Sequence, residues 1–200
     1  MNFIPYGRQN ISEDDITAVV EALQSDFLTQ GPAVESFEDV VKQYCGVRHG
    51  FAVANATCAL HLAYLALDVG CGDIVWTSPN TFLSTANAAL MCRADIDFVD
   101  ICPETYNMSV DKLEQKLIEA KNTGKLPKVV APVHFAGQSC DMKKIWQLSQ
   151  DYGFAIVEDA AHAIGGKYLD KPVGSCEYSD ITVFSFHPVK IITTGEGGML

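Results

Sequence analysis

The sequence predicts an α/β fold in which helices cover both faces of a mostly parallel central sheet. Short apolar segments recur along the 200 residues, and segments with helical periodicity separate most of them. Apolar residues make up 48% of the chain and charged residues 20%, a composition too hydrophobic for a disordered protein. The chain has no internal repeat, low-complexity tract or linker, so we expect a three-layer α/β/α domain.

Two helices are expected at the start of the chain. Ser12 and Asp15 have the spacing of a capping box, and Pro32 after Gly31 suits the first turn of a second helix. The apolar positions that share one helical face are Ile16, Val19, Val20 and Leu23 in the first helix, and Val34, Phe37, Val41 and Tyr44 in the second.

The rest of the chain alternates between strands and helices. The apolar segments expected to form strands are residues 51–54, 74–77, 96–101, 129–133, 154–157 and 181–186. Two later helices have the stripes Val110, Leu113, Leu117 and Ile145, Leu148, Tyr152, and Gly153 is a candidate end for the second. Residues 167–173 lie between glycines and are expected to form a surface hairpin or loop. The chain stops soon after its last apolar strand, so we expect it to be the first part of a larger subunit.

Composition also limits the partners and the compartment. The formal net charge is −11 and no basic run is present, which argues against a nucleic-acid partner. The uncharged stretches 49–67 and 74–92 contain several polar residues, so they favour a buried core over a membrane span. The seven cysteines form no C-x-x-C pair, and the N-terminus lacks a signal-peptide pattern. We therefore expect no metal site, reduced thiols and a cytoplasmic protein without a membrane anchor.

Several common catalytic motifs are absent. The chain has no G-x-x-x-x-G-K-[ST] phosphate loop, no H-E-x-x-H and no G-x-S-x-G, and Gly70-x-Gly72 lacks the third glycine of a dinucleotide-binding loop. These absences argue against phosphate-loop NTPases, Rossmann dehydrogenases, zincins and typical α/β-hydrolases. Candidate residues must therefore come from the carboxyl ends of the strands, where parallel sheets bind their ligands.

Two strand-end segments precede the middle of the chain. Residues 55–60 join a strand to a helix, whose first amides can bind an anion with the Thr57 hydroxyl as a further donor. The alternative is that Asn55 or Thr57 only caps this helix. Residues 78–82 follow the strand at 74–77, and Phe82 is either a stacking surface for an aromatic ligand or an ordinary core residue.

Two further segments follow later strands. Asp159 ends the strand that begins at residue 154, and His162 lies three residues beyond it; the acid either faces a ligand or caps a helix. Lys190 stands among apolar and small residues, five positions after Ser185 and before a glycine-rich stretch. A desolvated lysine loses its proton readily and attacks aldehydes, whereas a solvated loop lysine would not have these apolar neighbours. An anion cradle, a stacking ring, a buried acid and a reactive lysine are what pyridoxal phosphate requires.

These segments carry a resemblance to a known family. The segments are IPYGRQNISEDDI, SDFLTQGPAVESFE, VWTSPNTFLSTANAA, DFVDICPETYNMS, VEDAAHAIGG and FSFHPVKIITTGEGG, and together they extend over essentially the whole chain. The chain resembles the DegT/StrS-type sugar aminotransferases, which are fold type I pyridoxal-phosphate enzymes. Within them it is most similar to the nucleotide-sugar 4-aminotransferases of pseudaminic acid biosynthesis.

The resemblance implies a role for each matching residue. Lys190 forms the Schiff base with the cofactor and later shuttles a proton, and Asp159 pairs with the pyridine nitrogen. The other residues that the resemblance assigns to the cofactor are Ala56, Thr57 and Ser185 at the phosphate, Phe82 on the ring face and His162 near the ring hydroxyl. Position 56 is often glycine in the family, and Ala56 still offers its amide. Thr29, Gln30 and Gly31 are placed at the substrate entrance.

The resemblance also implies an activity and an assembly. An amino acid, expected to be glutamate, gives its amino group to a keto sugar nucleotide such as a UDP-4-keto-6-deoxy-N-acetylhexosamine, in surface polysaccharide or nonulosonic acid biosynthesis. Residues 1–200 correspond to the N-terminal, cofactor-binding large domain of a homodimer, and the C-terminal small domain is outside this chain. The alternatives are an amino-acid aminotransferase, a truncated or non-catalytic cofactor-binding protein, and a sugar dehydratase, in which histidine replaces the lysine.

Overall fold

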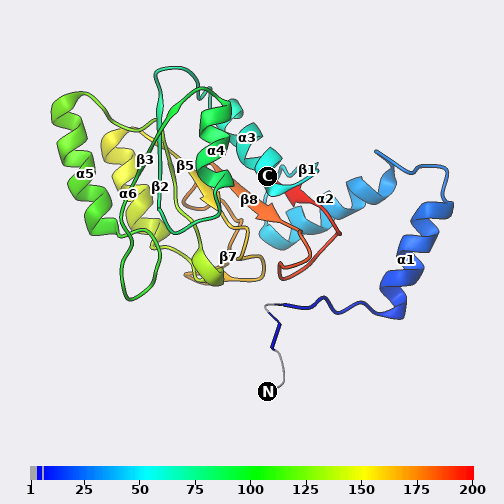
Figure 1. Cartoon of the computed structure of the whole chain (residues 1–200). Helices are drawn as coiled ribbons and strands as arrows, with labels where there is room; N and C mark the ends of the chain where they lie inside the picture. Colours follow the sequence, from blue (N-terminus) through cyan, green and yellow to red (C-terminus); the bar gives the residue numbers. More distant parts are fainter. Residues whose placement is uncertain (1–3, 6) are drawn as a thin grey trace.

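The centre of the molecule is a seven-stranded sheet (Figure 1). The computed structural model describes residues 4–5 and 7–200. The strand order is β1-β9-β8-β5-β4-β2-β3. The five parallel strands are β2 (Ile74–Thr77), β3 (Asp95–Phe98), β4 (Val129–Ala131), β5 (Ala155–Asp159) and β8 (Ile181–Ser185). Two short antiparallel strands, β9 (Gly198–Met199) and β1 (Ala52–Val53), extend the β8 edge, so the mostly parallel sheet is confirmed.

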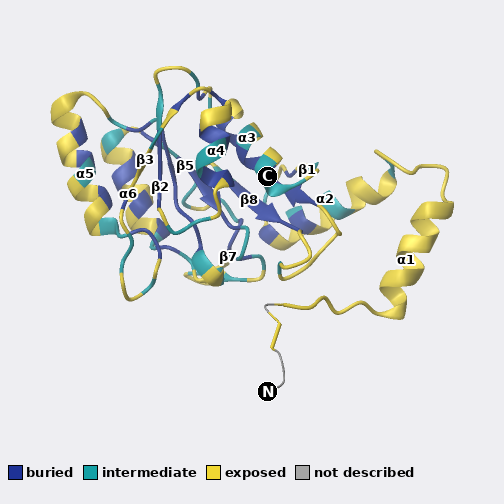
Figure 2. Ribbon diagram, viewed as in Figure 1, coloured by how far each residue is buried: buried dark blue, intermediate teal, exposed yellow. Residues whose placement is uncertain are grey.

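Helices cover both faces of this sheet. On one face α3 (Ala56–Ala66) and α4 (Ser84–Met91) share a core with Val157 of β5. On the other face α5 (Val110–Thr123) and α6 (Met142–Tyr152) share a core with Ile156, the preceding residue of the same strand. Successive strand residues point to opposite faces, so near-continuous apolar strands can supply both cores. Figure 2 shows the buried residues concentrated between these layers, which confirms the three-layer α/β/α fold.

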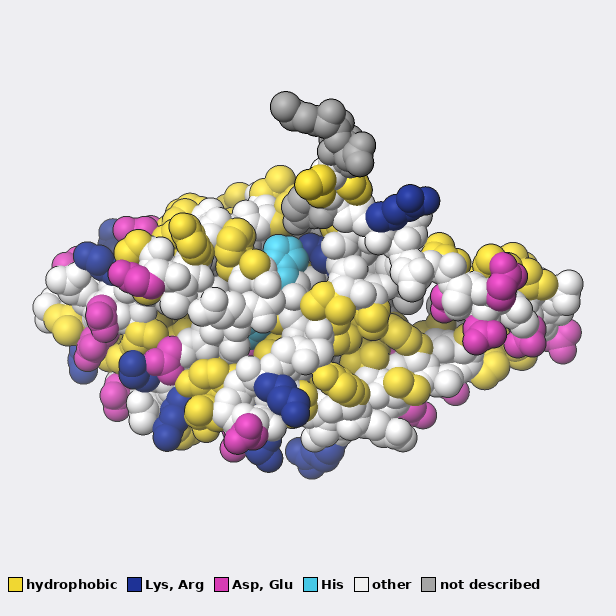
Figure 3. All heavy atoms as spheres, turned by 90° about the horizontal axis from the view of Figure 1, so that it is seen from below, with side chains coloured by type: hydrophobic (Ala, Val, Ile, Leu, Met, Phe, Trp, Pro, Cys, Tyr) yellow, Lys and Arg dark blue, Asp and Glu magenta, His cyan; other side chains and the backbone are white. Residues whose placement is uncertain are grey.

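The N-terminal helices form where the sequence predicts them. The capping box at Ser12 and Asp15 opens α1 (Glu13–Gln24), and α2 (Pro32–Cys45) begins at the expected proline. All 12 residues of α1 are exposed, and this helix projects from the body in Figure 1. In the view of Figure 3, acidic side chains gather on this projecting helix. The predicted apolar stripe of α1 therefore lies on a helix, but its residues are exposed to solvent in this structure.

The predicted hairpin is present, whereas helix α4 and strand β9 were not predicted. The segment at 167–173 forms the hairpin from β6 (Lys167–Tyr168) and β7 (Lys171–Pro172). Helix α4 was not predicted, because its sequence STANAALM consists mostly of small residues with no pronounced apolar stripe. Strand β9 has two residues, one of them glycine, which is too short for a period-two pattern. None of the helices in the described part of the chain has the length and apolarity that crossing a bilayer requires.

Candidate active site

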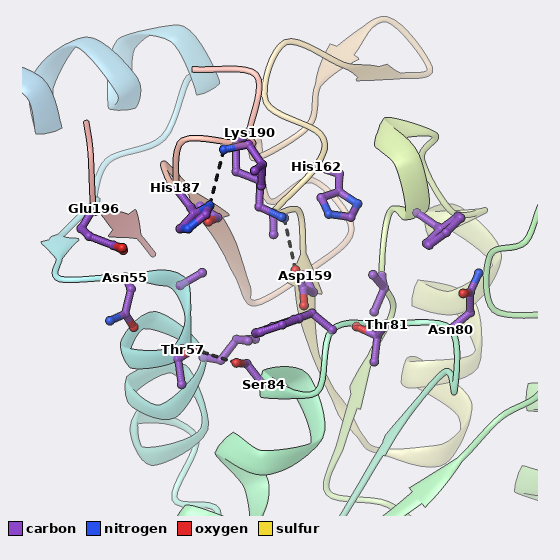
Figure 4. A pocket seen from close by; sticks show the side chains of 18 residues that line it. Asn55, Thr57, Asn80, Thr81, Ser84, Asp159, His162, His187, Lys190 and Glu196 are labelled. Atoms are coloured by element: carbon purple, nitrogen blue, oxygen red, sulfur yellow. Dashed lines mark hydrogen bonds between the residues drawn. The ribbon is translucent and has the colours of Figure 1, made fainter. Parts of the chain in front are cut away.

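A cavity of about 660 Å³ opens at the carboxyl ends of β5 and β8, beside the first turns of α3 and α4 (Figure 4). This volume is in the usual range for small-molecule sites. Seven residues predicted from the sequence line it: Ala56, Thr57, Phe82, Asp159, His162, Ser185 and Lys190. Other residues that line it include Asn55, Asn80, Thr81, Ser84, Phe135, His187 and Glu196. The topology thus brings residues from five separate segments into one cavity.

The first turn of α3 is arranged to receive an anion. Asn55 is the N-cap residue, and its Oδ1 accepts from the Cys58 amide at 2.9 Å. The amides of Ala56 and Thr57 precede Cys58, in the turn where a helix has no carbonyl to accept from them. The Thr57 and Ser84 hydroxyls lie 2.7 Å apart, so α4 contributes a second hydroxyl to the same end of the cavity. Amides, hydroxyls and the positive end of the helix dipole together favour a phosphate group.

Strand β9 packs directly behind this turn. A Cβ atom added to Gly198 would lie 2.4 Å from the carbonyl carbon of Asn55 and 2.6 Å from the nitrogen of Ala56. These are backbone atoms, which cannot move aside as a flexible side chain could. The glycine is therefore required for the close approach of β9 to the start of α3.

Asp159 lies at the end of β5, where 5% of its surface is exposed. Its Oδ2 accepts a hydrogen bond from the Thr85 hydroxyl at 2.6 Å, and its Oδ1 accepts one from the Ala161 amide at 3.1 Å. Each carboxylate oxygen can accept a further hydrogen bond, and the side chain lines the cavity. A cationic N–H group bound in the cavity could donate a further hydrogen bond to the Asp159 carboxylate.

Lys190 enters the cavity from the loop after β8. Its amide donates to the carbonyl of His187 at 2.9 Å, which turns the chain at this point. Burial lowers the pKa of the Lys190 ammonium, while the negative charge of Asp159 acts in the opposite direction. The net pKa lies below the usual value for lysine, so a larger share of the amine is neutral and nucleophilic at a given pH.

Aromatic side chains also line the cavity. Phe82 is 68% exposed and lines the cavity, so the interpretation of this residue as ordinary core is wrong. The His162 ring packs edge-on against Phe135, with 6.3 Å between the ring centroids. Burial, followed by the Lys190 charge, lowers the pKa of His162, which therefore favours the neutral imidazole. Aromatic rings therefore line the same cavity as the anion end and the acid.

Three predicted residues do not line the cavity, and two residues that were not predicted contact the site. Among the described residues, those that line the cavity do not include Thr29, Gln30 or Gly31, which lie between α1 and α2. Their assignment to the substrate entrance stays a prediction. Ser84 and Thr85 contact predicted site residues but were not selected from the sequence. No sequence pattern indicated them, because the helix that they begin has no pronounced apolar stripe.

A comparison with protein families decides what kind of chain this is. A sequence model of the DegT/DnrJ/EryC1/StrS aminotransferase family matches residues 9–200. The chain belongs to this family. A relative described as UDP-4-amino-4,6-dideoxy-N-acetyl-beta-L-altrosamine transaminase, from Campylobacter jejuni subsp. jejuni serotype O:23/36, is 44% identical over 195 residues. That match covers 98% of this chain and 50% of the relative.

Solved structures of sugar-modifying proteins have the same fold. PseC of Helicobacter pylori, an aminotransferase involved in pseudaminic acid biosynthesis, has a TM-score of 0.88 and 30% identity over 98% of this chain and 51% of its own. The PLP form of Spr1654 from Streptococcus pneumoniae has a TM-score of 0.88 and 33% identity, and covers 98% and 52% of the two chains. The chain therefore spans about half the length of the relatives it matches. The resemblance to this family and to its pyridoxal-phosphate fold is confirmed.

Proposed function

We propose that the full-length protein is a pyridoxal-phosphate-dependent aminotransferase that transfers an amino group from glutamate to a UDP-linked 4-keto-6-deoxy-N-acetylhexosamine. The observation that carries the proposal is the convergence of Lys190, Asp159 and the first turn of α3 on one cavity. Similarity to a UDP-4-amino-4,6-dideoxy sugar transaminase supports the substrate class. Residues 1–200 would form the cofactor-binding domain, since the chain spans about half of that relative.

The residues of the cavity fit pyridoxal phosphate at three points. The amides of Ala56 and Thr57 face the phosphate end, and Ser185 at the end of β8 lines the same cavity. The exposed ring of Phe82 offers a flat face for stacking. Lys190 is the half-buried amine that would hold the group covalently. When bound, pyridoxal phosphate supplies an electron-accepting ring beside the carbon that carries the transferred amino group.

The protein residues have separable tasks in this reaction. The charged Asp159 carboxylate favours a protonated pyridine nitrogen, because two opposite charges in a nearly buried site stabilise each other. The Nζ of Lys190, once free, takes the proton from the Cα of glutamate and returns one at the reacting carbon. Its lowered pKa suits this work as a general base. His162 and Phe82 contribute ring surface to the lining of the cavity.

We place this enzyme in the cytoplasm as a homodimer. The seven cysteines are free thiols, which is typical of proteins from a reducing compartment. The open apolar stripe of α1, with Ile16 at 48% and Leu23 at 66% exposure, supports a further partner surface in the complete assembly. The partners are the nucleotide sugar, the amino-acid donor and the second subunit; the net charge of −11 argues against nucleic acid.

The test is amino transfer by the full-length protein loaded with pyridoxal phosphate. With glutamate and the UDP-keto sugar, we expect 2-oxoglutarate and the UDP-amino sugar in equal amounts by mass spectrometry. Lys190→Ala should abolish this transfer, whereas Lys167→Ala, on the exposed hairpin, should retain it. Transfer to simple keto acids but to no keto sugar would show an amino-acid aminotransferase. Cofactor binding without transfer to either class would show a non-catalytic protein.

A further inference from the structure

Thr85 is a fully buried residue in the first turn of α4 that contacts the predicted catalytic acid. Its backbone is fixed on both sides, because its amide donates to the Phe82 carbonyl at 3.2 Å and its carbonyl accepts from the Tyr64 hydroxyl at 3.0 Å. Its hydroxyl donates to Oδ2 of Asp159 at 2.6 Å. The contact joins residues that are 74 positions apart in the chain, so only the fold creates it.

The direction of the hydrogen bonds follows from what each group can donate. A carboxylate only accepts, so the single proton of the Thr85 hydroxyl belongs to the bond with Asp159. The Thr81 hydroxyl lies 2.8 Å from the Thr85 hydroxyl and is then the donor to it. The alternative acceptor of Thr85, the Phe82 carbonyl, lies farther away, at 3.2 Å. A distance of 2.6 Å is typical of an O–H group that donates to a charged carboxylate.

We call residues 81–85, which include Thr85, the threonine turn. This turn also contacts other parts of the site. Ser84 of this turn contacts Thr57 at the anion end, and the exposed ring of Phe82 lines the same cavity. The labelled side chains in Figure 4 show Thr81 and Ser84 on the same wall, with Asp159 above them. Thr85 therefore couples the position of Asp159 to the wall that would contact the cofactor.

We propose that Thr85 is a positioning residue that keeps the Asp159 carboxylate directed into the cavity, with Thr81 as the donor that orients Thr85. The proposal rests on the function proposed above. A buried carboxylate that lacks this donor can rotate away from the cavity, and the rotation would remove the partner of a protonated pyridine nitrogen. The hydroxyl of Thr85 prevents this rotation.

The test uses the full-length protein loaded with pyridoxal phosphate. Thr85→Val keeps the shape of the side chain and removes the hydroxyl, and Thr85→Ser keeps the hydroxyl and removes the methyl group. Hydrogen bonds to charged groups stabilise by an amount that corresponds to about 10- to 100-fold in rate. We therefore expect Thr85→Val to lower kcat by this factor with KM little changed, and Thr85→Ser to restore most of it.

A spectroscopic readout separates positioning from a general loss of structure. With a less positive pyridine ring, the nitrogen that joins Lys190 to the cofactor binds a proton more readily. The midpoint of the pH-dependent absorbance change of the bound cofactor should therefore shift to higher pH in Thr85→Val. The midpoint should be unchanged in Thr85→Ser. Thr182→Val is the matched control, since Thr182 is a buried threonine that donates to Glu158 instead, at 3.1 Å.

The outcomes distinguish the two proposals. The positioning role is wrong if Thr85→Val retains the parental kcat and titration, or if Thr85→Ser is as damaged as Thr85→Val. Should Thr85→Val fail to fold, Thr81→Val repeats the test at a partly exposed position, and a parental titration there would contradict the inference. If the unaltered protein showed no cofactor absorbance, the proposed function itself would fail, and the inference with it.

Discussion

Two neighbouring carboxylates on β5 have different environments, although each is 5% exposed. Glu158 accepts hydrogen bonds from His134 Nε2 at 2.6 Å, from Thr182 at 3.1 Å and from the Ser179 hydroxyl. Asp159 has one side-chain donor, Thr85, and its side chain opens on the cavity. Successive residues of a strand point to opposite faces, which separates the two groups. The difference shows that the neighbours, and not the acid itself, decide whether a buried carboxylate can bind a ligand.

The Glu158 cluster is internally complete. The Cys140 amide donates to Nδ1 of His134 at 3.1 Å, so the ring proton is on Nε2 and is donated to Glu158. Burial raises the pKa of the Glu158 carboxyl, but its interactions with His134, and then with Ser179 and Thr182, outweigh burial and the net pKa is lowered. The charge stays on Glu158 with every nearby donor in use. We therefore assign this cluster to stability and the Asp159 side to chemistry.

The largest effect is expected from Asp159→Asn. Asparagine keeps the shape but removes the charge that favours a protonated pyridine nitrogen. We expect turnover by the full-length protein to fall about 10²- to 10⁴-fold. Its denaturant-unfolding midpoint should fall less than its turnover does, because the amide oxygen can still accept from Thr85 and only the Ala161 amide loses its acceptor. Near-normal turnover would mean that another acid performs this task.

Glu158→Gln tests the other side of the comparison. All three of its donors then face a group that is no longer charged, so the free energy of unfolding should fall by about 1–3 kcal/mol. The kcat of the folded protein should stay within a few-fold of the parental value. Glu177→Gln, at an exposed position on the same loop as Ser179, is the control and should change neither quantity. A loss of turnover by orders of magnitude at unchanged stability would assign Glu158 a chemical role.

Gly198→Ala tests the first turn of α3, which forms the anion end of the cavity that Asp159 lines. The added methyl group would overlap the backbone of Asn55 and Ala56, so the first turn of α3 must shift. Overpacking of this kind corresponds to about a tenfold or greater loss of affinity for pyridoxal phosphate, measured by equilibrium titration. Gly70→Ala, where a Cβ meets no atom within 4 Å, is the matched control. Equal affinities for the two variants would show that this turn does not bind the phosphate group.

The smallest effect concerns the pH dependence of covalent loading. Only the neutral Lys190 amine attacks an aldehyde, so the loading rate should rise through a pKa that burial has lowered. The Asp159 charge raises that pKa, so Asp159→Asn should shift the midpoint of the rate profile to lower pH. Asp170→Asn, exposed on the hairpin, should leave it in place. A shift to higher pH in Asp159→Asn would contradict this electrostatic coupling.

The sequence predicted those features that local pattern determines. The capping box at Ser12, the proline start of α2 and the glycine end of α6 each need only a few neighbouring residues. The strand-end segments were found because parallel strands bring their carboxyl ends to one edge. Phe82, Asp159 and Lys190 could therefore be expected in a common site before any contact was known.

Contacts between distant segments could not be predicted in this way. The Thr85 bond to Asp159 and the His134 bond to Glu158 depend on the packing of separate elements. Helix α4 gave no signal because small residues have weak amphipathic patterning. The apolar stripe on α1 predicted the helix, and the structure leaves this stripe exposed.

The most direct test of the account is borohydride reduction of the full-length protein loaded with pyridoxal phosphate, followed by peptide mass spectrometry. Reduction makes the bond between the cofactor and its lysine permanent, so the modified residue can be read from the peptide. We predict the mass of one reduced cofactor on the peptide that contains Lys190, and none on that peptide in Lys190→Ala. Label on Lys167 or Lys171, or no label at all, would contradict the central claim.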